Sequence, residues 1–430
     1  MSTGGSASSI SVETLPSGLR LVTEAMPEVH SVAIGFWVGS GSRDEPEELA
    51  GASHFLEHLL FKGTPTLSAA AIAEALDEVG GDCNAYTTKE YTTFFVRLLA
   101  EHLPLGLDIL SQIMWDPALR PADVESERTV IQDEILMHAD EPADLVVERC
   151  LGALFPGHPL GRDALGTAES VAAITTDDVR GFFEAHYRPE NMVVSVAGRI
   201  HHDEVAAAIE ARFAGNPGGA PPQRREPGEA GEALVVVTRP TEQAHLTLGT
   251  RCVSRFDDDR WAFSVLNHVL GGGMSSRLFQ KVREQRGLAY SIGSERVAFA
   301  DAGSLCVVVG TAPGHVEEVL TIVTAELEQL AADGVSEREL AVAKGNLRAE
   351  ALLATEDSGA RMSRIGSALL LQGEVKRVEE ILERVDSVSL DDVRRVARVL
   401  AEQPRTLAVV GPFEPADFEG ALGGLAAHLS

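Results

Sequence analysis

The chain has 430 residues, which is too many for one ordinary hydrophobic core and predicts at least two domains. Apolar residues make up 44% and charged residues 23% of the chain, as in soluble globular proteins. The net charge of −29 argues against a nucleic-acid-binding protein, since a phosphate-binding surface needs clustered lysines and arginines. The same charge would favour basic substrates, but an acidic, solvated surface is the simpler explanation.

Two features of the sequence bear on its cellular location. No apolar run reaches the length of a membrane span, and residues 1–18 have neither the basic nor the apolar region of a secretory signal. The four cysteines lie far apart and form no CxxC pair: Cys83, Cys150, Cys252 and Cys306. This spacing is not typical of a disulfide framework or a thiolate metal site. We therefore expect a cytoplasmic protein that does not associate with membranes.

The first part of the chain alternates between strand and helix patterns. In chain order, the strand patterns lie at 18–26, 31–41, 82–88, 91–99 and 191–198. Helical spacing of apolar residues covers Glu48–Phe61, Ser68–Val79 and 202–213, with a further series of helices before the last strand. This mixture predicts an α+β domain over residues 1–215.

A second domain with the same order of elements follows a linker. Residues 216–232 are rich in Pro, Gly and charge without periodicity, which predicts a linker. Beyond it, residues 233–430 begin with strands at 233–239 and 244–250 and helices at 260–270 and 275–285. They continue with strands at 287–294 and 302–311, long helices, and a last strand at 405–411. The repeated order indicates a duplication.

The best local register of the two halves places "HFLEHLLFKG" over "SVLNHVLGGG". In this register His54, Glu57 and His58 lie over Ser264, Asn267 and His268. The second copy therefore keeps the helix and loses the candidate metal chemistry, as expected when only one half of a duplication keeps a site.

The stretch "GASHFLEHLLFKGT" carries a candidate metal site. Residues four apart lie on one face of a helix, so His54 and His58 can bind one ion, with Glu57 placed beside them to accept a proton. The alternative is a helix with polar residues in a boundary layer. Its leucines and phenylalanines predict substantial burial, and buried histidines need partners, which favours zinc with one further protein ligand and an open position.

The motif resembles the inverted H-x-x-E-H motif of the inverzincins. More closely, the chain resembles the family of pitrilysin, insulin-degrading enzyme and mitochondrial processing peptidase, in its processing-peptidase-like branch. The matching stretches are "GASHFLEHLLFKGT", "GGDCNAYTTKEYTTF", "ERTVIQDEI" and "LGGGMSSRLFQKVREQRGLAYSI". The resemblance covers nearly the whole chain. It implies two homologous halves, each a mostly antiparallel sheet flanked by helices, which together form half of a clamshell.

The resemblance also implies roles for individual residues. In "ERTVIQDEI", Glu134 takes the position of the third metal ligand, and Glu127, two helical turns earlier, that of an acceptor that orients a histidine. Asn84 and Ala85 match an edge strand that binds an extended peptide by strand addition.

A second pair of substrate contacts is implied for the second half. Arg283 and Tyr290 match a pair that binds the substrate backbone and the developing oxyanion. Arg286 is the alternative to Arg283, although the spacing to Tyr290 favours Arg283.

Together these residues predict a zinc metalloendopeptidase with one Zn²⁺ per chain. Glu57 would be the general base on zinc-bound water, and the substrates would be peptides or unfolded segments in an enclosed chamber. We expect a homodimer, with a heterodimer as the alternative. A non-catalytic assembly or scaffold subunit of the same fold is the second hypothesis, which the complete set of His54, Glu57, His58 and Glu134 disfavours.

Overall fold

The computed structural model describes residues 10–215, 218–231 and 233–418. Residues 216, 217 and 232 of the predicted linker lie outside this description. The chain forms two compact units. The first unit comprises the chain up to Ile135 with Asp163–Arg224 and Leu352–Lys376, and the second comprises Leu136–Arg162, Arg225–Ala351 and the chain from Arg377 onward.

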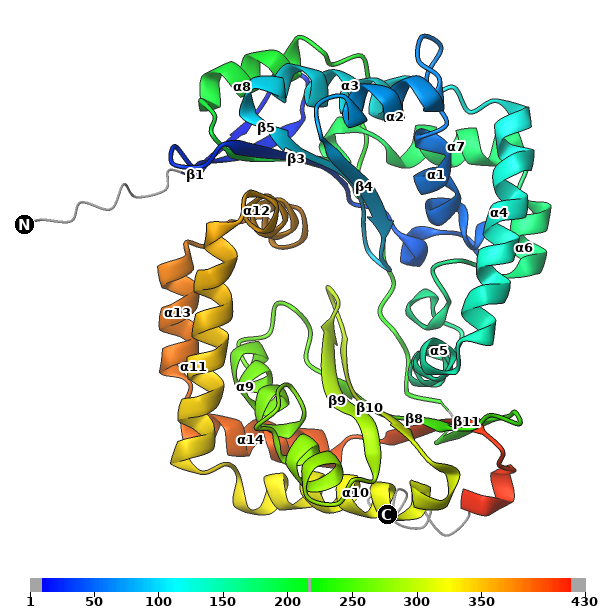
Figure 1. The fold of residues 1–430 in the computed structure, drawn as a ribbon, viewed down its shortest axis with the longest axis vertical. Helices are drawn as coiled ribbons and strands as arrows, with labels where there is room; N and C mark the ends of the chain where they lie inside the picture. The colour runs from blue at the N-terminus through cyan, green and yellow to red at the C-terminus, as the bar shows by residue number, and fades with distance from the viewer. Residues whose placement is uncertain (1–9, 216–217, 232, 419–430) are drawn as a thin grey trace, which may run out of the picture. The chain divides into compact units, whose positions relative to one another are not determined.

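The first unit is built on a six-stranded sheet in the order β1-β2-β6-β3-β5-β4. Its strands are β1 (Ile10–Thr14), β2 (Arg20–Ala25), β3 (Ser31–Val38), β4 (Asp82–Thr87), β5 (Thr92–Leu99) and β6 (Met192–Gly198). Neighbouring strands are antiparallel except β2 and β6, which are parallel. β4 therefore lies at one edge of the sheet (Figure 1).

The second unit repeats this topology in a five-stranded sheet in the order β7-β11-β8-β10-β9. Its strands are β7 (Leu234–Thr238), β8 (Ala244–Cys252), β9 (Ala289–Ala298), β10 (Gly303–Thr311) and β11 (Arg405–Gly411). Again one pair, β7 with β11, is parallel and the others are antiparallel. The order matches β2-β6-β3-β5-β4, so the predicted fold of two homologous, mostly antiparallel halves is confirmed.

Helices cover both sheets. The first half of the sequence contributes α1 (Ala52–Leu60), α2 (Ala69–Asp77), α3 (Leu103–Trp115), α4 (Pro121–Asp140), α5 (Pro142–Leu154), α6 (Ala168–Ala173), α7 (Thr176–His186) and α8 (His202–Glu210). The second half contributes α9 (Arg260–Leu270), α10 (Val316–Asp333), α11 (Glu337–Leu353), α12 (Ser358–Gln372), α13 (Val378–Ser387) and α14 (Leu390–Glu402). Across the described ranges, no helix has both the length and the apolar composition needed to cross a membrane.

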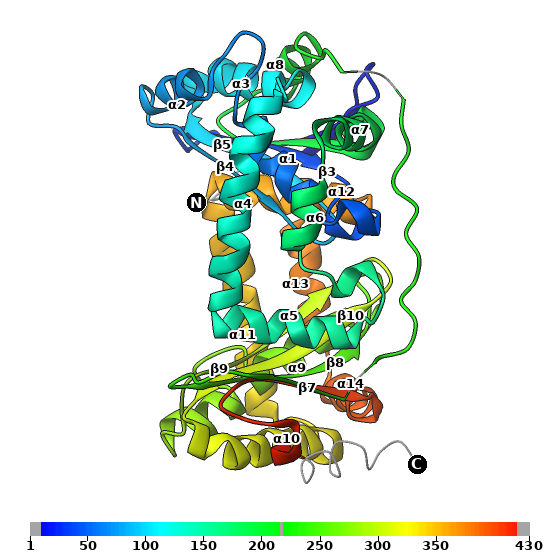
Figure 2. The ribbon, with the colours of Figure 1, turned by 90° about the vertical axis from the view of Figure 1, so that its right-hand side faces the viewer.

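Each unit contains one helix supplied by the other half of the sequence. α12 packs on β3 and β6 in the first unit (Figure 1), where Met362 and Ile365 join a core with Trp37. α5 packs on β8 and β11 in the second unit (Figure 2), where Val146 joins a core with Val410. The compact units therefore differ from the contiguous ranges 1–215 and 233–430 by this exchange of segments.

Two predicted helices differ in detail from the observed ones. Glu48–Phe61 is not one helix, because a 3₁₀ turn at Glu47–Leu49 precedes Gly51, whose φ of +96° interrupts the helical path before α1. The predicted helix at 275–285 is largely a π-helical segment, Phe279–Glu284. Such segments often occur near functional sites.

Candidate metal centre

Helix α1, which carries the paired histidines, packs against the core of the first unit. Its first turn is capped by the Glu45 carboxylate, which accepts hydrogen bonds from Gly51 N at 2.8 Å and Ser53 N at 2.7 Å. This arrangement satisfies amides that a helix start leaves without partners. The side chains of Phe55 and Leu59 anchor α1 in the core, so His54 and His58 are held on one fixed face.

The structure brings His54, His58 and Glu134 together, the last from α4. His54 Nε2 lies 3.2 Å from His58 Nε2, and Glu134 Oε2 lies 3.6 Å and 3.5 Å from these two nitrogens. Ligands at zinc-bond lengths of about 2.1 Å in tetrahedral directions lie about 3.4 Å apart. The three donor atoms therefore fit one tetrahedral zinc ion, which would leave the fourth position to a non-protein ligand.

The protonation state of His54 also suits a metal ligand. Burial, reinforced by the charge of His58, lowers the pKa of His54 to about 3. The imidazole is then neutral at physiological pH, and the neutral imidazole is the form that binds metals. The side chain of Glu134 is 42% exposed, so the ion site opens toward solvent on the α4 side.

A buried carboxylate fixes the orientation of His58. Glu127, on α4, is 3% exposed, and its Oε2 lies 3.1 Å from His58 Nδ1. Because Nε2 is directed at the other ligand atoms, Nδ1 carries the proton and donates a hydrogen bond to this oxygen. The second oxygen of Glu127 forms an ion pair with Lys62. Glu127 therefore lies where the family resemblance implied an acceptor that orients a histidine.

The candidate base, Glu57, lies beside the three candidate ligands and is half-buried. Its Oε2 accepts a hydrogen bond of 2.6 Å from Thr87 Oγ1, on β4. Burial raises the pKa of the Glu57 carboxyl, and the Thr87 hydrogen bond and the His58 charge oppose that rise. A carboxylate with a raised pKa is a better proton acceptor than an exposed one.

The predicted peptide-binding residues lie on the edge strand of the same unit. Asn84 is exposed and Ala85 is buried, as expected for successive residues of β4. The Asn84 side-chain oxygen accepts a hydrogen bond from the Ala85 amide at 2.8 Å. An edge strand is the element to which an extended peptide can add.

The other predicted pair belongs to the second unit, where the two residues meet. The Arg283 guanidinium lies 4.9 Å from the ring centre of Tyr290 and 4.8 Å from that of Phe279. Tyr290 is 79% exposed. Arg286 points elsewhere, donating to the Lys281 carbonyl at 2.8 Å. The contact with Tyr290 distinguishes Arg283 from Arg286, and a role of the pair in substrate binding stays a prediction.

Comparison with known proteins identifies the family. The family described as "Insulinase (Peptidase family M16)" matches residues 20–168, and "Peptidase M16 inactive domain" matches residues 173–347. The chain belongs to peptidase family M16.

Full-length relatives agree with this assignment. An uncharacterized zinc protease of Mycobacterium tuberculosis is 44% identical over 404 residues, 93% of this chain and 92% of the relative. An uncharacterized zinc protease of Bacillus subtilis is 37% identical over 399 residues, 93% of this chain and 97% of the relative.

Solved structures share the M16 fold. A peptidase M16 inactive domain from Pseudomonas fluorescens matches with a TM-score of 0.88 and 19% identity, over 94% of this chain and 98% of that one. A Helicobacter pylori protease matches with a TM-score of 0.87 and 22% identity, over 94% and 99%. A chain of complex III₂ from Candida albicans matches with a TM-score of 0.83 and 20% identity, over 95% and 97%.

The described part of the second half of this M16 chain has no counterpart of the metal-binding set. Among the residues that the structure describes, His54, His58 and Glu134 are the group of three His, Cys or acidic side chains arranged to hold an ion. In α9, Ser264 instead donates to the Arg260 carbonyl, and His268 is buried. This agrees with the register that placed Ser264, Asn267 and His268 over the polar triplet of α1.

Two residues of the site were missed in the sequence. Lys62 lies four residues after His58, a spacing that could have suggested a shared partner. Thr87 lies in the quoted stretch "GGDCNAYTTKEYTTF", but nothing in the sequence shows which residue of β4 faces α1. Both act on residues of the site, Lys62 on Glu127 and Thr87 on Glu57.

Proposed function

We propose that this M16 protein is a zinc-dependent endopeptidase that hydrolyses peptides or unfolded segments, with Glu57 as the general base. One observation carries the proposal: the donor atoms of His54, His58 and Glu134 are spaced like tetrahedral zinc ligands, with the half-buried carboxylate of Glu57 beside them. The relatives named zinc proteases support the choice of metal and reaction.

The chain's own residues have separate tasks in this proposal. A zinc ion, when bound, supplies Lewis acidity for peptide hydrolysis. Glu57 takes a proton from the attacking water and passes it to the leaving amine. Because Thr87 occupies one oxygen of Glu57, the other is left to carry this proton. Glu127 holds His58 in the tautomer that presents Nε2.

Substrate binding is proposed to start at the edge of the first sheet. An extended peptide would add to β4 through main-chain hydrogen bonds, with Asn84 and Ala85 beside it. Arg283 and Tyr290 would contribute contacts to the substrate backbone and oxyanion. A processing-peptidase-like homodimer in the cytoplasm, with an enclosed chamber, completes the proposal.

The decisive experiment separates metal binding from catalysis. Glu57→Gln should retain about one zinc per chain, measured by plasma mass spectrometry, and lose about 10²–10⁴-fold in peptide cleavage. His58→Ala should lose the zinc as well as the activity. Glu48→Gln, a carboxylate-to-amide change at an exposed position before α1, is the matched control and should behave like the wild type. Undiminished cleavage by Glu57→Gln would remove Glu57 as the base.

A scaffold function is the second candidate, because the chain shares its fold with a component of complex III₂ from Candida albicans. Cleavage of a peptide library by the purified wild-type protein, abolished by a chelator and restored by zinc, distinguishes the two. A zinc-loaded wild type that cleaves no peptide would favour the scaffold.

A further inference from the structure

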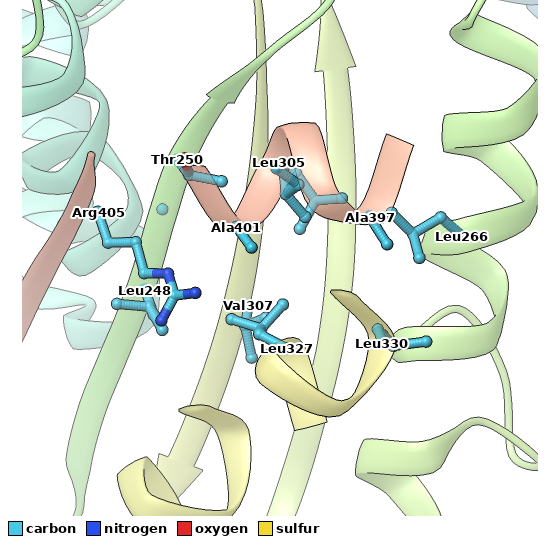
Figure 3. A pocket seen from close by; sticks show the side chains of 12 residues that line it. Leu248, Thr250, Leu266, Leu305, Val307, Leu327, Leu330, Ala397, Ala401 and Arg405 are labelled. Atoms are coloured by element: carbon cyan, nitrogen blue, oxygen red, sulfur yellow. The ribbon is translucent and has the colours of Figure 1, made fainter. Parts of the chain in front are cut away.

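The core of the second unit contains a small cavity, away from the residues assigned to catalysis. It lies between β8 and β10 of the sheet and the helices α9, α10 and α14 (Figure 3). Its walls are almost entirely aliphatic, with Leu248, Val307 and Leu327 among them. One charged residue, Arg405 at the start of β11, completes the lining.

The Arg405 side chain is directed into this cavity. Figure 3 shows it reaching past Leu248 toward Val307 and Leu327. Arg405 is 5% exposed, and neither Nη1 nor Nη2 has a hydrogen-bond partner among the described residues. Thr250, the other polar residue of the lining, donates its hydroxyl proton to the Pro404 carbonyl at 3.0 Å.

This arrangement leaves a buried positive charge without a direct counter-charge. A guanidinium cannot lose its proton in proteins, so burial cannot be relieved by neutralisation, although it lowers the pKa of Arg405. Glu328 on α10 acts on Arg405 through its charge, but its side chain belongs to an exposed residue and no ion pair within the described ranges joins the two. Buried charges in folded proteins are normally paired.

The chemistry of the walls indicates which partner is missing. Two N–H donors converge on the cavity, and its other walls are aliphatic apart from Thr250. A water molecule there could accept from the arginine and donate one hydrogen to Thr250 Oγ1, but it would leave the buried guanidinium without a counter-charge. A ligand that only accepts hydrogen bonds and carries negative charge matches the site better.

Size restricts this ligand to a small ion. The cavity has a volume of about 10 Å³, measured as the space open to the centre of a water-sized sphere. The open space therefore extends about 1.4 Å beyond this volume on every side, which accommodates one monatomic ion. Phosphate, sulfate and the carboxylates of peptides are too large. We propose that Arg405 binds a small monovalent inorganic anion inside the core of the second unit. Chloride is the anion used to test this proposal. This site is independent of the proposed peptidase function.

Bromide offers a direct test, because it resembles chloride and is visible by anomalous X-ray scattering. Crystals of the full chain grown or soaked in sodium bromide should show an anomalous peak within hydrogen-bonding distance of Arg405 Nη1 or Nη2. A cavity that shows no peak while surface bromide sites are occupied would overturn the proposal, as would an ordered water at the guanidinium.

A solution test measures the same site through stability. An anion that binds the folded state alone raises the melting temperature. At chloride concentrations about five times the dissociation constant, the transition of the second unit should rise by about 2–4 °C relative to equal ionic strength of gluconate, which is too large to enter. A melting temperature that is the same in both salts would contradict the proposal.

Three variants assign the effect. Arg405→Met should abolish the chloride response, while Arg338→Met, which removes an exposed arginine of α11, should keep it. Glu328→Gln removes the nearby negative charge and should strengthen the response. If Glu328 were instead the true partner of Arg405, Glu328→Gln would lower the melting temperature and no chloride response would be seen in the wild type.

Discussion

Opposing effects act on the pKa of Glu57, and their balance sets the pH range of the proposed reaction. Burial raises its pKa, and the hydrogen bond from Thr87 lowers it. Thr87→Val removes that hydrogen bond with little change in volume, so the pKa of Glu57 should rise further. A base works only when it is deprotonated, so the acidic limb of the kcat/KM profile should move to higher pH.

The expected loss of kcat/KM on the acidic side is roughly 2- to 10-fold, the equivalent of one ordinary hydrogen bond. The measurement is a pH profile of kcat/KM on a peptide substrate, with zinc content unchanged. Thr87→Ser keeps the hydroxyl and should restore the wild-type limb. An unaltered limb in Thr87→Val would show that the hydroxyl does not tune Glu57.

The site residues that could be predicted from the sequence alone are those that lie close together along the chain. His54, Glu57 and His58 lie within five residues on one helix, so helical geometry alone brings them together. Glu134 and Glu127 lie on α4, far along the chain, and only the family resemblance indicated them. Thr87 could not be predicted, because its contact with Glu57 depends on how β4 packs against α1.

At the level of elements, α12 is bound to the first sheet by an ion triad centred on a buried carboxylate. Glu24 on β2 is 1% exposed, and its two carboxylate oxygens accept from Arg361 at 2.7 Å and Arg364 at 2.9 Å. Both arginines lie on α12. The triad therefore links a strand from the start of the chain to a helix from the second half of the sequence.

Glu24→Gln should lower the free energy of unfolding by about 2–3 kcal/mol, because it leaves two guanidinium groups without their counter-charge. The value lies below the roughly 3–5 kcal/mol of fully buried pairs, since both arginines are partly solvated. Urea unfolding followed by circular dichroism measures it. Glu374→Gln, which breaks an exposed pair with Lys376, is the control and should resemble the wild type. Equal stability of the two variants would show that the triad does not anchor α12.

The strands that both sheets share and their repeated order were predictable, whereas β1 and the exchange of helices were not. Alternating and continuous apolar runs identify strands, and the two halves gave the same succession. The amphipathic pattern of α5 or α12 shows that one face is buried, but not against which sheet. The break before α1 was also missed, although Gly51 is the residue type that its positive φ requires.

For the whole molecule, the two units should respond to different ligands. His54 and His58 come from α1 and Glu134 from α4, and all three belong to the first unit. A zinc ion bound to them would join two helices that are far apart in the sequence. Binding to the folded state alone stabilises by RT ln(1 + [L]/Kd), or about 2.7 kcal/mol at a hundredfold excess over Kd.

Removal of zinc with a chelator should therefore lower the melting temperature of the first unit by about 5–10 °C, since about 1 kcal/mol corresponds to 2–4 °C in units of this size. Differential scanning calorimetry with and without chelator measures the shift. Glu57→Gln keeps all three ligands and should show the full shift, while His58→Ala should show none.

Chloride should leave this zinc-dependent shift unchanged, because Arg405 belongs to the second unit. Even where the two transitions overlap, His58→Ala removes the zinc response alone and Arg405→Met the chloride response alone. A chelator shift that persists in His58→Ala would place the stabilising ion elsewhere in the molecule, and the zinc site on α1 and α4 would lose its support.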